Sequence, residues 1–242
     1  MDLKLVYLLI MRYIVSVAVI SCGRSGTNMV LEILAGNSYF VPSVPEEDKK
    51  LCKSGIVYDD NYLTKCDTVY MNYEQLKATL IANPKMKVIW TIRNPRDLAM
   101  SKIYRGQTYE NGGDCKTLAD DATLDGCLAD VEVMFNLYKN VIKDFRRRVL
   151  LIKMEDVIND IVTETKKMCN FVGITYQEDM IKFYERMRNQ NKSKRYSGID
   201  KGEVDKYLNW KTAYDGFFVN YDMESLFRQL NVYSKYFGYK EF

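Results

Sequence analysis

The stretch that decides the fold is Tyr13–Asn28, which reads YIVSVAVISCGRSGTN. Its first half, Tyr13–Ile20, is a short run rich in β-branched residues without polar alternation, which is typical of a strand covered on both faces of a parallel sheet. A glycine-containing turn follows at once. After the turn, apolar residues recur at helical spacing and stop before Gly36, a good helix terminator: Met29, Val30, Ile33 and Leu34. The unit is therefore strand, tight loop and helix.

The rest of the chain repeats this alternation. Two more strands of the buried type are predicted at Lys87–Ile92 and Val149–Ile152, and helices at Glu74–Ile81, from Pro95 onward, at Leu128–Phe145 and at Val157–Phe171. Residues 38–66 are expected to form a connecting loop with a short helix near Glu46–Leu51, and residues 106–126 a second loop. Strands that alternate with helices predict a three-layer α/β fold, with a central parallel sheet flanked by helices and right-handed crossovers.

Length and composition favour one globular domain over residues 1–242, with residues 1–12 as an N-terminal extension. Residues 189–205 are polar, basic and glycine-containing, which suits a flap. The hydrophobic fraction of 47% supplies a sizeable core and excludes a disordered chain. A net charge of +3 is too balanced for a dedicated nucleic-acid binder, so any anion site must be local. Oligomeric state is left open by the sequence.

The absence of histidine excludes His-ligated metal sites, Ser-His-Asp triads and imidazole bases. The six cysteines form no CxxC pair, which argues against structural zinc. Cys115 and Cys127 bracket a polar stretch and are candidates for a loop disulfide, but free thiols in a reducing cytoplasm are the favoured interpretation. Lys4 and Arg12 interrupt the apolar N-terminal stretch, so stable membrane insertion is not expected.

The turn Cys22–Asn28 has the character of an anion site. It lies where a strand feeds the N-terminus of a helix, and there the unpaired N–H groups and the helix dipole favour a phosphate or sulfate. Arg24 adds a permanent charge, Gly26 allows close approach, and three side chains supply donors: Ser25, Thr27 and Asn28. No Gly-Lys-Ser/Thr follows at Walker A spacing.

A second candidate anion site follows the strand at Lys87–Ile92. Arg93 stands at its end, Pro95 opens a helix, and Ser101 lies eight residues after Arg93 on that helix. A guanidinium and a hydroxyl so placed can converge on one phosphate. An Arg-Asn-Pro-Arg-Asp turn is also a common capped helix start, so its combination with the first loop is what points to function.

Together, Arg24–Thr27 after a strand and Arg93–Asp97 with Ser101 resemble the sulfotransferases that use 3′-phosphoadenosine 5′-phosphosulfate (PAPS). The resemblance implies a P-loop-like fold in which residues 24–28 hold the 5′-phosphosulfate, with Arg24 in the place of the catalytic Lys/Arg of the loop. It implies that Arg93 and Ser101 hold the 3′-phosphate. It extends to weaker matches: Val149–Asp156, Phe171–Gly173, and a late loop with Arg195, Gly198 and Trp210, where Arg195 would touch the 3′-phosphate. Met29 stands where cytosolic members carry an aromatic residue.

The resemblance implies transfer of a sulfuryl group to a hydroxyl or amine of a small molecule, glycan or peptide, with no metal. Because the chain has no histidine, the proton acceptor must be another residue, and other branches of the family use a glutamate. Glu46 and Glu47 stand 22 and 23 residues after Arg24 and are the leading candidates, with Glu74 behind them. The alternatives are a P-loop kinase of small molecules and a non-catalytic nucleotide-binding relative.

Overall fold

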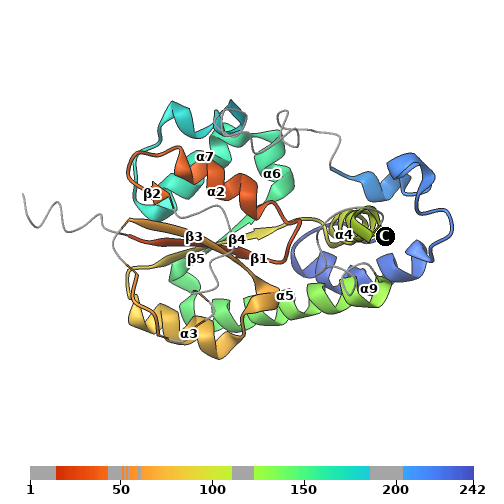
Figure 1. Cartoon of the computed structure of the whole chain (residues 1–242), viewed down its shortest axis with the longest axis horizontal. Coiled ribbons are helices and arrows are strands. Elements are labelled where there is room, and N and C mark those ends of the chain that lie inside the picture. The colour runs from red at the N-terminus through yellow and green to blue at the C-terminus, as the bar shows by residue number, and fades with distance from the viewer. Residues whose placement is uncertain are drawn as a thin grey trace, which may run out of the picture.

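The computed structural model describes residues 15–42, 51, 53, 55–58, 61–110, 123–185 and 204–242. Its sheet has five strands in the order β2-β3-β1-β4-β5, and every neighbouring pair is parallel (Figure 1). The strands are β1 (Val17–Ser21), β2 (Val41–Pro42), β3 (Tyr62–Asp67), β4 (Lys87–Ile92) and β5 (Val149–Lys153). The predicted α/β class with a central parallel sheet is confirmed.

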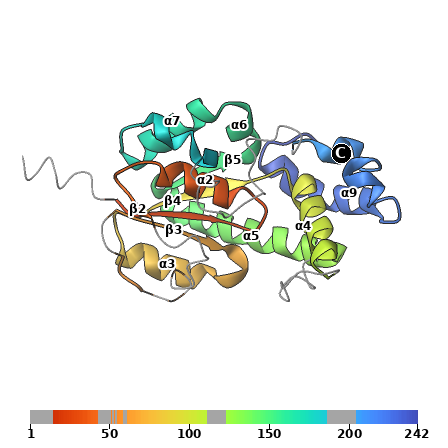
Figure 2. The ribbon, with the colours of Figure 1, turned by 45° about the horizontal axis from the view of Figure 1, so that its top comes forward.

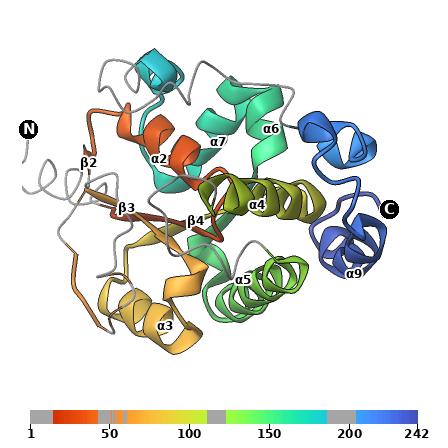
Figure 3. The same ribbon diagram turned by 45° about the vertical axis from the view of Figure 1, so that its right-hand side comes forward.

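Helices cover both faces of the sheet (Figure 1). On one side lie α2 (Thr27–Ala35), α6 (Met154–Asn159) and α7 (Ile161–Val172), and on the other lie α3 (Tyr73–Ala82) and α5 (Leu124–Phe145). Two more helices, α4 (Pro95–Glu110) and α9 (Met223–Tyr236), pack on each other beyond the strand ends (Figures 2 and 3). Short 3-10 turns are η1 (Thr68–Tyr70), η3 (Arg146–Arg148), η4 (Glu178–Met180), η6 (Lys206–Asn209) and η7 (Ala213–Gly216).

The core lies in two layers, one on each face of the sheet. Val17 and Val19 of β1 belong to the apolar cluster under α2 and α7, whereas Ala18 and Ile20 belong to the cluster against α3 and α5. Successive side chains of a strand point to opposite faces, so a strand buried on both faces needs apolar residues at every position. This is why the run at Tyr13–Ile20 predicted a central strand.

Several elements differ from the sequence-based prediction, among them the short strand β2 within the loop expected at residues 38–66. Residues 62–67, expected in a loop, form β3, and the prediction failed because Thr64 and Lys65 interrupt the apolar pattern although both are buried. The helix expected at Val157–Phe171 is divided into α6 and α7 at Asp160, whose side chain accepts a hydrogen bond from the N–H of Thr163 at 3.0 Å and so caps α7. Helix α4 continues to Glu110, into the expected loop.

Three of the predicted segments fall wholly or partly outside the described residues. They are residues 1–12, residues 46–50 of the expected short helix, and residues 189–203 of the expected flap. Helix α9 was not predicted. Among the described helices, none is both long and apolar enough to cross a membrane.

Arg148 ties the far end of the sheet to α3. Its guanidinium donates to three backbone carbonyls, those of Leu80 and Asn83 at 2.8 Å and that of Met86 at 3.0 Å. These carbonyls lie at the end of α3 and before β4, where acceptors lack intrahelical partners. The role of Arg148 within the arginine run 146–148 is therefore structural.

Candidate active site

The first predicted anion loop forms the turn between β1 and α2. Arg24 adopts a left-handed conformation, with φ of 74°, and Gly26 does the same at the N-cap of α2, with φ of 84°. Arginine seldom adopts positive φ, and such strain is concentrated at functional sites. The N-cap makes no side-chain hydrogen bond and the first turn of α2 holds no acidic residue, so its N–H groups and positive dipole end are left for an anion.

Close packing explains the glycines of this loop. A Cβ on Gly23 would lie 2.8 Å from Oδ2 of Asp67, and one on Gly26 would lie 3.2 Å from Cγ of Met154. The loop therefore passes directly against the end of β3 and the start of α6. Ser25 is fully buried within it, with its Oγ 3.4 Å from Sγ of Cys22, whereas Arg24 and Asn28 are exposed.

The two predicted anion sites meet. Nε of Arg24 donates to Oγ of Ser101 on α4 at 3.1 Å. The parallel pairing of β1 with β4 brings these residues together, because it places the two strand ends at the same edge of the sheet. Arg93, at the end of β4, is almost fully buried beside them. A cationic, donor-rich region thus extends from the first loop to the first turns of α4.

The turn after β4 is held by buried carboxylates. The N–H of Asn94 donates to Oε1 of Glu155 at 2.7 Å, and Oε2 of Glu155 accepts from the hydroxyl of Tyr239 at 2.8 Å. The side chain of Asn94 accepts from the N–H of Arg96 at 3.2 Å, which caps α4 where Pro95 predicted its start. Glu155 and Tyr239, from other parts of the chain, therefore hold this turn in place.

Asp97 holds a later segment of the chain against the same turn. Its carboxylate accepts from the N–H of Asp205 at 2.8 Å and from the N–H of Tyr207 at 2.9 Å. Burial raises the pKa of Asp97 to about 6, against the opposing effects of the Arg93 charge and of these two hydrogen bonds. The end of the expected flap, at Asp205, is therefore bound to the first turn of α4.

Beneath the loop lies a buried ion pair that the sequence analysis did not identify. Lys102, next to Ser101, pairs with Asp130 of α5. Burial raises the pKa of the Cys22 thiol to about 12, which the charge of Lys102 partly opposes, so this thiol stays protonated and is no nucleophile at neutral pH. The place of this cation beneath the loop follows from the packing of α4 on α5, which the sequence does not show.

A further carboxylate stands beside the loop. Asp67 ends β3, opposite Ser21 in the parallel register, with its Oδ2 against Gly23 and its Oδ1 accepting from the N–H of Val69 at 3.3 Å. The sequence analysis missed it because it missed β3. A strand assignment for residues 62–67 would have placed Asp67 at the functional edge of the sheet.

The remaining predicted residues have different outcomes. Glu46, Glu47, Arg195 and Cys115 lie outside the described residues. Glu74 is exposed in the first turn of α3, where an acidic side chain favours the helix. Cys127 is a buried free thiol. No cluster of three or more metal-ligating side chains occurs among the residues that the structure describes.

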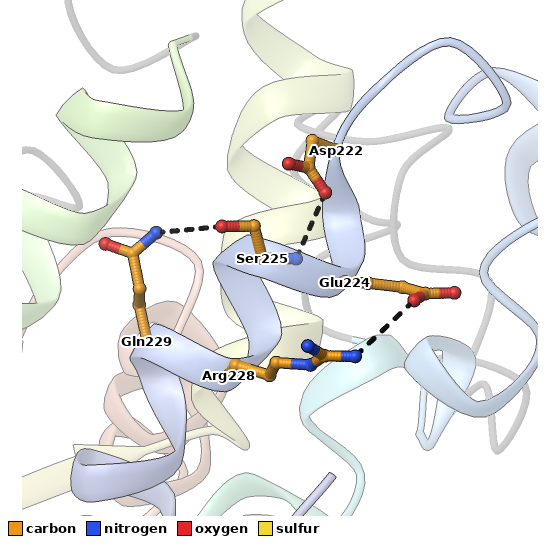
Figure 4. A pocket seen from close by; sticks show the side chains of 5 residues that line it. All are labelled: Asp222, Glu224, Ser225, Arg228 and Gln229. Carbon is orange, nitrogen blue, oxygen red and sulfur yellow. Dashed lines mark hydrogen bonds and ion pairs between the residues drawn. The ribbon is translucent and has the colours of Figure 1, made fainter.

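A surface pocket at the start of α9 is chemically different. It is lined by five polar side chains, Asp222, Glu224, Ser225, Arg228 and Gln229, that bond largely to one another (Figure 4). Arg228, the only cation among them, lies 3.9 Å from Glu224. The pocket shares no lining residue with the loop region and does not contribute to it.

Comparison with known proteins identifies the family and agrees with the observed fold. The family model for the sulfotransferase domain matches residues 16–210. A search of curated proteins finds no significant match to the sequence. Among solved structures, the sulfotransferase domain from the curacin biosynthetic pathway superimposes with a TM-score of 0.64 at 13% identity, covering 93% of this chain and 98% of its own.

Two other solved structures have the same fold. The sulfotransferase domain of the Synechococcus PCC 7002 olefin synthase gives a TM-score of 0.60 at 14% identity, covering 93% of this chain and 95% of its own. A mouse sulfotransferase in complex with PAP gives 0.50 at 20% identity, covering 87% of each chain.

The chain has an α/β fold with a central parallel sheet, and its two predicted anion-binding segments lie at one edge of that sheet. The match of the family model over most of the chain shows its family. The chain belongs to the sulfotransferase family, and its reaction is sulfuryl transfer.

Proposed function

We propose that this chain transfers the sulfuryl group of PAPS to a hydroxyl or amine, with the donor bound across the two anion sites. Arg24, Ser25, Gly26, Thr27 and Asn28 would bind the 5′-phosphosulfate, and Arg93 and Ser101 the 3′-phosphate. The observation that carries the proposal is the 3.1 Å hydrogen bond from Arg24 to Ser101, which joins the two sites. The mouse sulfotransferase of the same fold is a complex with PAP. PAP is 3′-phosphoadenosine 5′-phosphate, the product that remains when PAPS has lost its sulfuryl group.

The proposed reaction is an in-line displacement at sulfur. The bond from sulfur to the bridging oxygen of the 5′-phosphosulfate breaks, its electron pair stays on that oxygen, and a new bond joins sulfur to the acceptor oxygen or nitrogen. Arg24 and the N–H groups of the first turn of α2 would stabilise the charge that grows on the leaving phosphate. The acceptor's proton passes to a carboxylate. No metal has a role in this scheme.

Among the described residues, Asp67 is the carboxylate best placed to accept that proton. It lies against Gly23 of the loop, at the same strand-end edge as Arg24. Val69 and Tyr70 follow it, and each is 44% exposed, which places apolar surface beside the proposed base. The first acceptors to test are therefore small phenols and alcohols that carry an apolar body. Glu46 and Glu47 remain proposed proton acceptors on the basis of the sequence.

The donor is tested by calorimetry with PAP, adenosine 5′-phosphate and ATP, in EDTA and in magnesium. We expect PAP to bind in EDTA and to raise the melting temperature by mass action. We also expect adenosine 5′-phosphate to bind more weakly, because the contacts of Arg93 and Ser101 are lost. Equal affinity for the two nucleotides would refute the 3′-phosphate assignment, and magnesium-dependent binding of ATP alone would favour a kinase.

The proton acceptor is tested by PAPS turnover, followed as PAP release with a panel of phenols, alcohols, amines, glycans and peptides. Asp67→Asn, Glu46→Gln and Glu47→Gln each remove a base while keeping shape. The catalytic carboxylate is the one whose variant loses turnover with PAP affinity unchanged. Full activity in Asp67→Asn would remove Asp67 from the mechanism.

We also propose that residues 1–242 form one domain and that residues 189–205, with Arg195, close over the nucleotide. The bonds of Asp97 to the N–H groups of Asp205 and Tyr207 support this, since they fix the end of that segment beside the 3′-phosphate site. A reducing compartment such as the cytoplasm is consistent with the free thiols of Cys22, Cys66, Cys127 and Cys169.

A further inference from the structure

The segment that follows α9 reaches back to the turn after β4. Helix α9 ends at Tyr236, with Phe237 as its C-cap. Gly238, with φ of 72°, then turns the chain so that Tyr239 and Lys240 lie against the residues around Arg93. This segment lies beyond residues 16–210, the part matched by the family model. Its contacts are with buried charged groups of the site, not with the apolar core alone.

The first contact runs through Glu155. This carboxylate is nine-tenths buried and has two partners: its Oε1 accepts from the N–H of Asn94 at 2.7 Å, and its Oε2 accepts from the hydroxyl of Tyr239 at 2.8 Å. The first partner is the residue next to Arg93. A buried carboxylate keeps one orientation when both oxygens are engaged, so the hydroxyl of Tyr239 helps to hold the peptide that carries Arg93.

The second contact runs through Arg96. Its guanidinium is fully buried, donates through Nη2 to the carbonyl of Lys240, and lies 4.3 Å from the ring centre of Tyr207. Among the described residues, its Nε and Nη1 have no hydrogen-bond partner. Burial lowers the pKa of Arg96, which reflects the cost of keeping this charge away from water. The carbonyl of Lys240 is thus its main polar support.

Lys153, at the end of β5, secures the same segment from outside. Its Nζ lies 4.5 Å from the ring centre of Tyr239 and 3.4 Å from the carbonyl oxygen of Gly238, to which it donates. The ring of Tyr239 is therefore held on Lys153 independently of its hydroxyl. Removal of the hydroxyl alone is a mild change that leaves the segment in place.

We infer that Gly238–Lys240 is a positioning element for the 3′-phosphate site, acting through Glu155 and Arg96 on the turn Arg93–Asp97. The inference rests on the proposed function, because it assumes that Arg93 binds the 3′-phosphate. Its consequence is selective. Loosening the segment weakens recognition of the 3′-phosphate and leaves binding of the rest of the nucleotide, which depends on the first loop, unchanged.

The test is the ratio of the dissociation constants of adenosine 5′-phosphate and PAP, measured by calorimetry on the full chain. Tyr239→Phe is expected to lower this ratio by about fivefold or more, the lower end of typical couplings between sites. Arg96→Met, which removes the tie to Lys240 and a costly buried charge, is expected to lower it too without a large loss of melting temperature. Tyr236→Phe, which removes an exposed hydroxyl one turn earlier on α9, should leave the ratio unchanged.

The outcomes separate the inference from the proposed function. A normal ratio in folded Tyr239→Phe and Arg96→Met, or equal weakening of both nucleotides, would overturn the positioning role while the wild-type preference for PAP still supports the donor site. A wild-type protein without that preference would overturn the donor site itself, and the inference with it.

Discussion

Ser101→Ala removes the hydroxyl that joins the two proposed anion sites. The hydroxyl accepts a hydrogen bond from the Arg24 guanidinium at 3.1 Å and is almost fully buried. In the proposed complex this hydroxyl also bonds the 3′-phosphate, and hydrogen bonds to charged groups contribute about 1.5–3 kcal/mol. Because each 1.4 kcal/mol is a factor of ten, PAP affinity should fall by about 10- to 150-fold. Adenosine 5′-phosphate should lose much less, because it lacks the 3′-phosphate.

A double-mutant cycle separates the direct contact with the nucleotide from the orientation of Arg24. Arg24→Ala, Ser101→Ala and the double variant are compared by PAP calorimetry, with Ser225→Ala on the exposed start of α9 as the control. We expect a coupling energy between about 0.5 and 3 kcal/mol, the range for residues in contact. Additive losses, within about 0.3 kcal/mol, would show that the two residues act independently and would refute the reasoning.

Three further predictions concern stability. Gly23→Ala places a Cβ 2.8 Å from Oδ2 of Asp67, the end of a side chain, so it should lower stability by about 1 kcal/mol, the low end of overpacking costs. An unchanged melting temperature would contradict the close packing. Arg148→Ala leaves three carbonyls without a donor and should cost about 2–4 kcal/mol, whereas Arg146→Ala, on the exposed side of the run, should cost under about 0.5 kcal/mol in the same denaturant titration. Because the pKa of Asp97 is raised to about 6 in the folded protein, its contribution to stability is greatest below its unfolded pKa of about 4 and is lost as the pH rises through 6. The difference in unfolding free energy between wild type and Asp97→Asn should therefore change by up to about 3 kcal/mol between pH 4 and 7, and a constant difference would count against it.

The three strands built around a run of mostly apolar residues could be predicted from the sequence. Lys87–Ile92 was predicted with the observed bounds, and Tyr13–Ile20 and Val149–Ile152 differ from β1 and β5 only at their ends. Strand β3 was missed, because burial of Thr64 and Lys65 depends on neighbours that become adjacent only when the sheet assembles. The local pattern that identifies a strand is absent where tertiary structure overrides it.

The residues of the candidate site were likewise predicted only in part. Its two anion clusters are each continuous in sequence and follow a strand, so general rules for parallel sheets placed them correctly at one edge. Asp67 was lost together with its strand. Lys102 carries no local signal. Asp97 and Glu155 lie within the matched segments Arg93–Asp97 and Val149–Asp156, but the pattern does not show their roles. Each of the three residues acts through a partner on another element: Asp130, Tyr207, and Asn94 with Tyr239.

The distances along the chain explain how this site depends on the whole fold. The contacts that hold it join residues 77 apart for Arg24 and Ser101, 84 apart for Glu155 and Tyr239, and 110 apart for Asp97 and Tyr207. The first of these contacts depends on strand pairing, since the register of β1 with β4 brings the loop to α4. The left-handed backbone of Arg24 is therefore maintained by tertiary contacts rather than by local preference, and variants that loosen α9 or β5 should affect nucleotide binding although they touch neither anion loop.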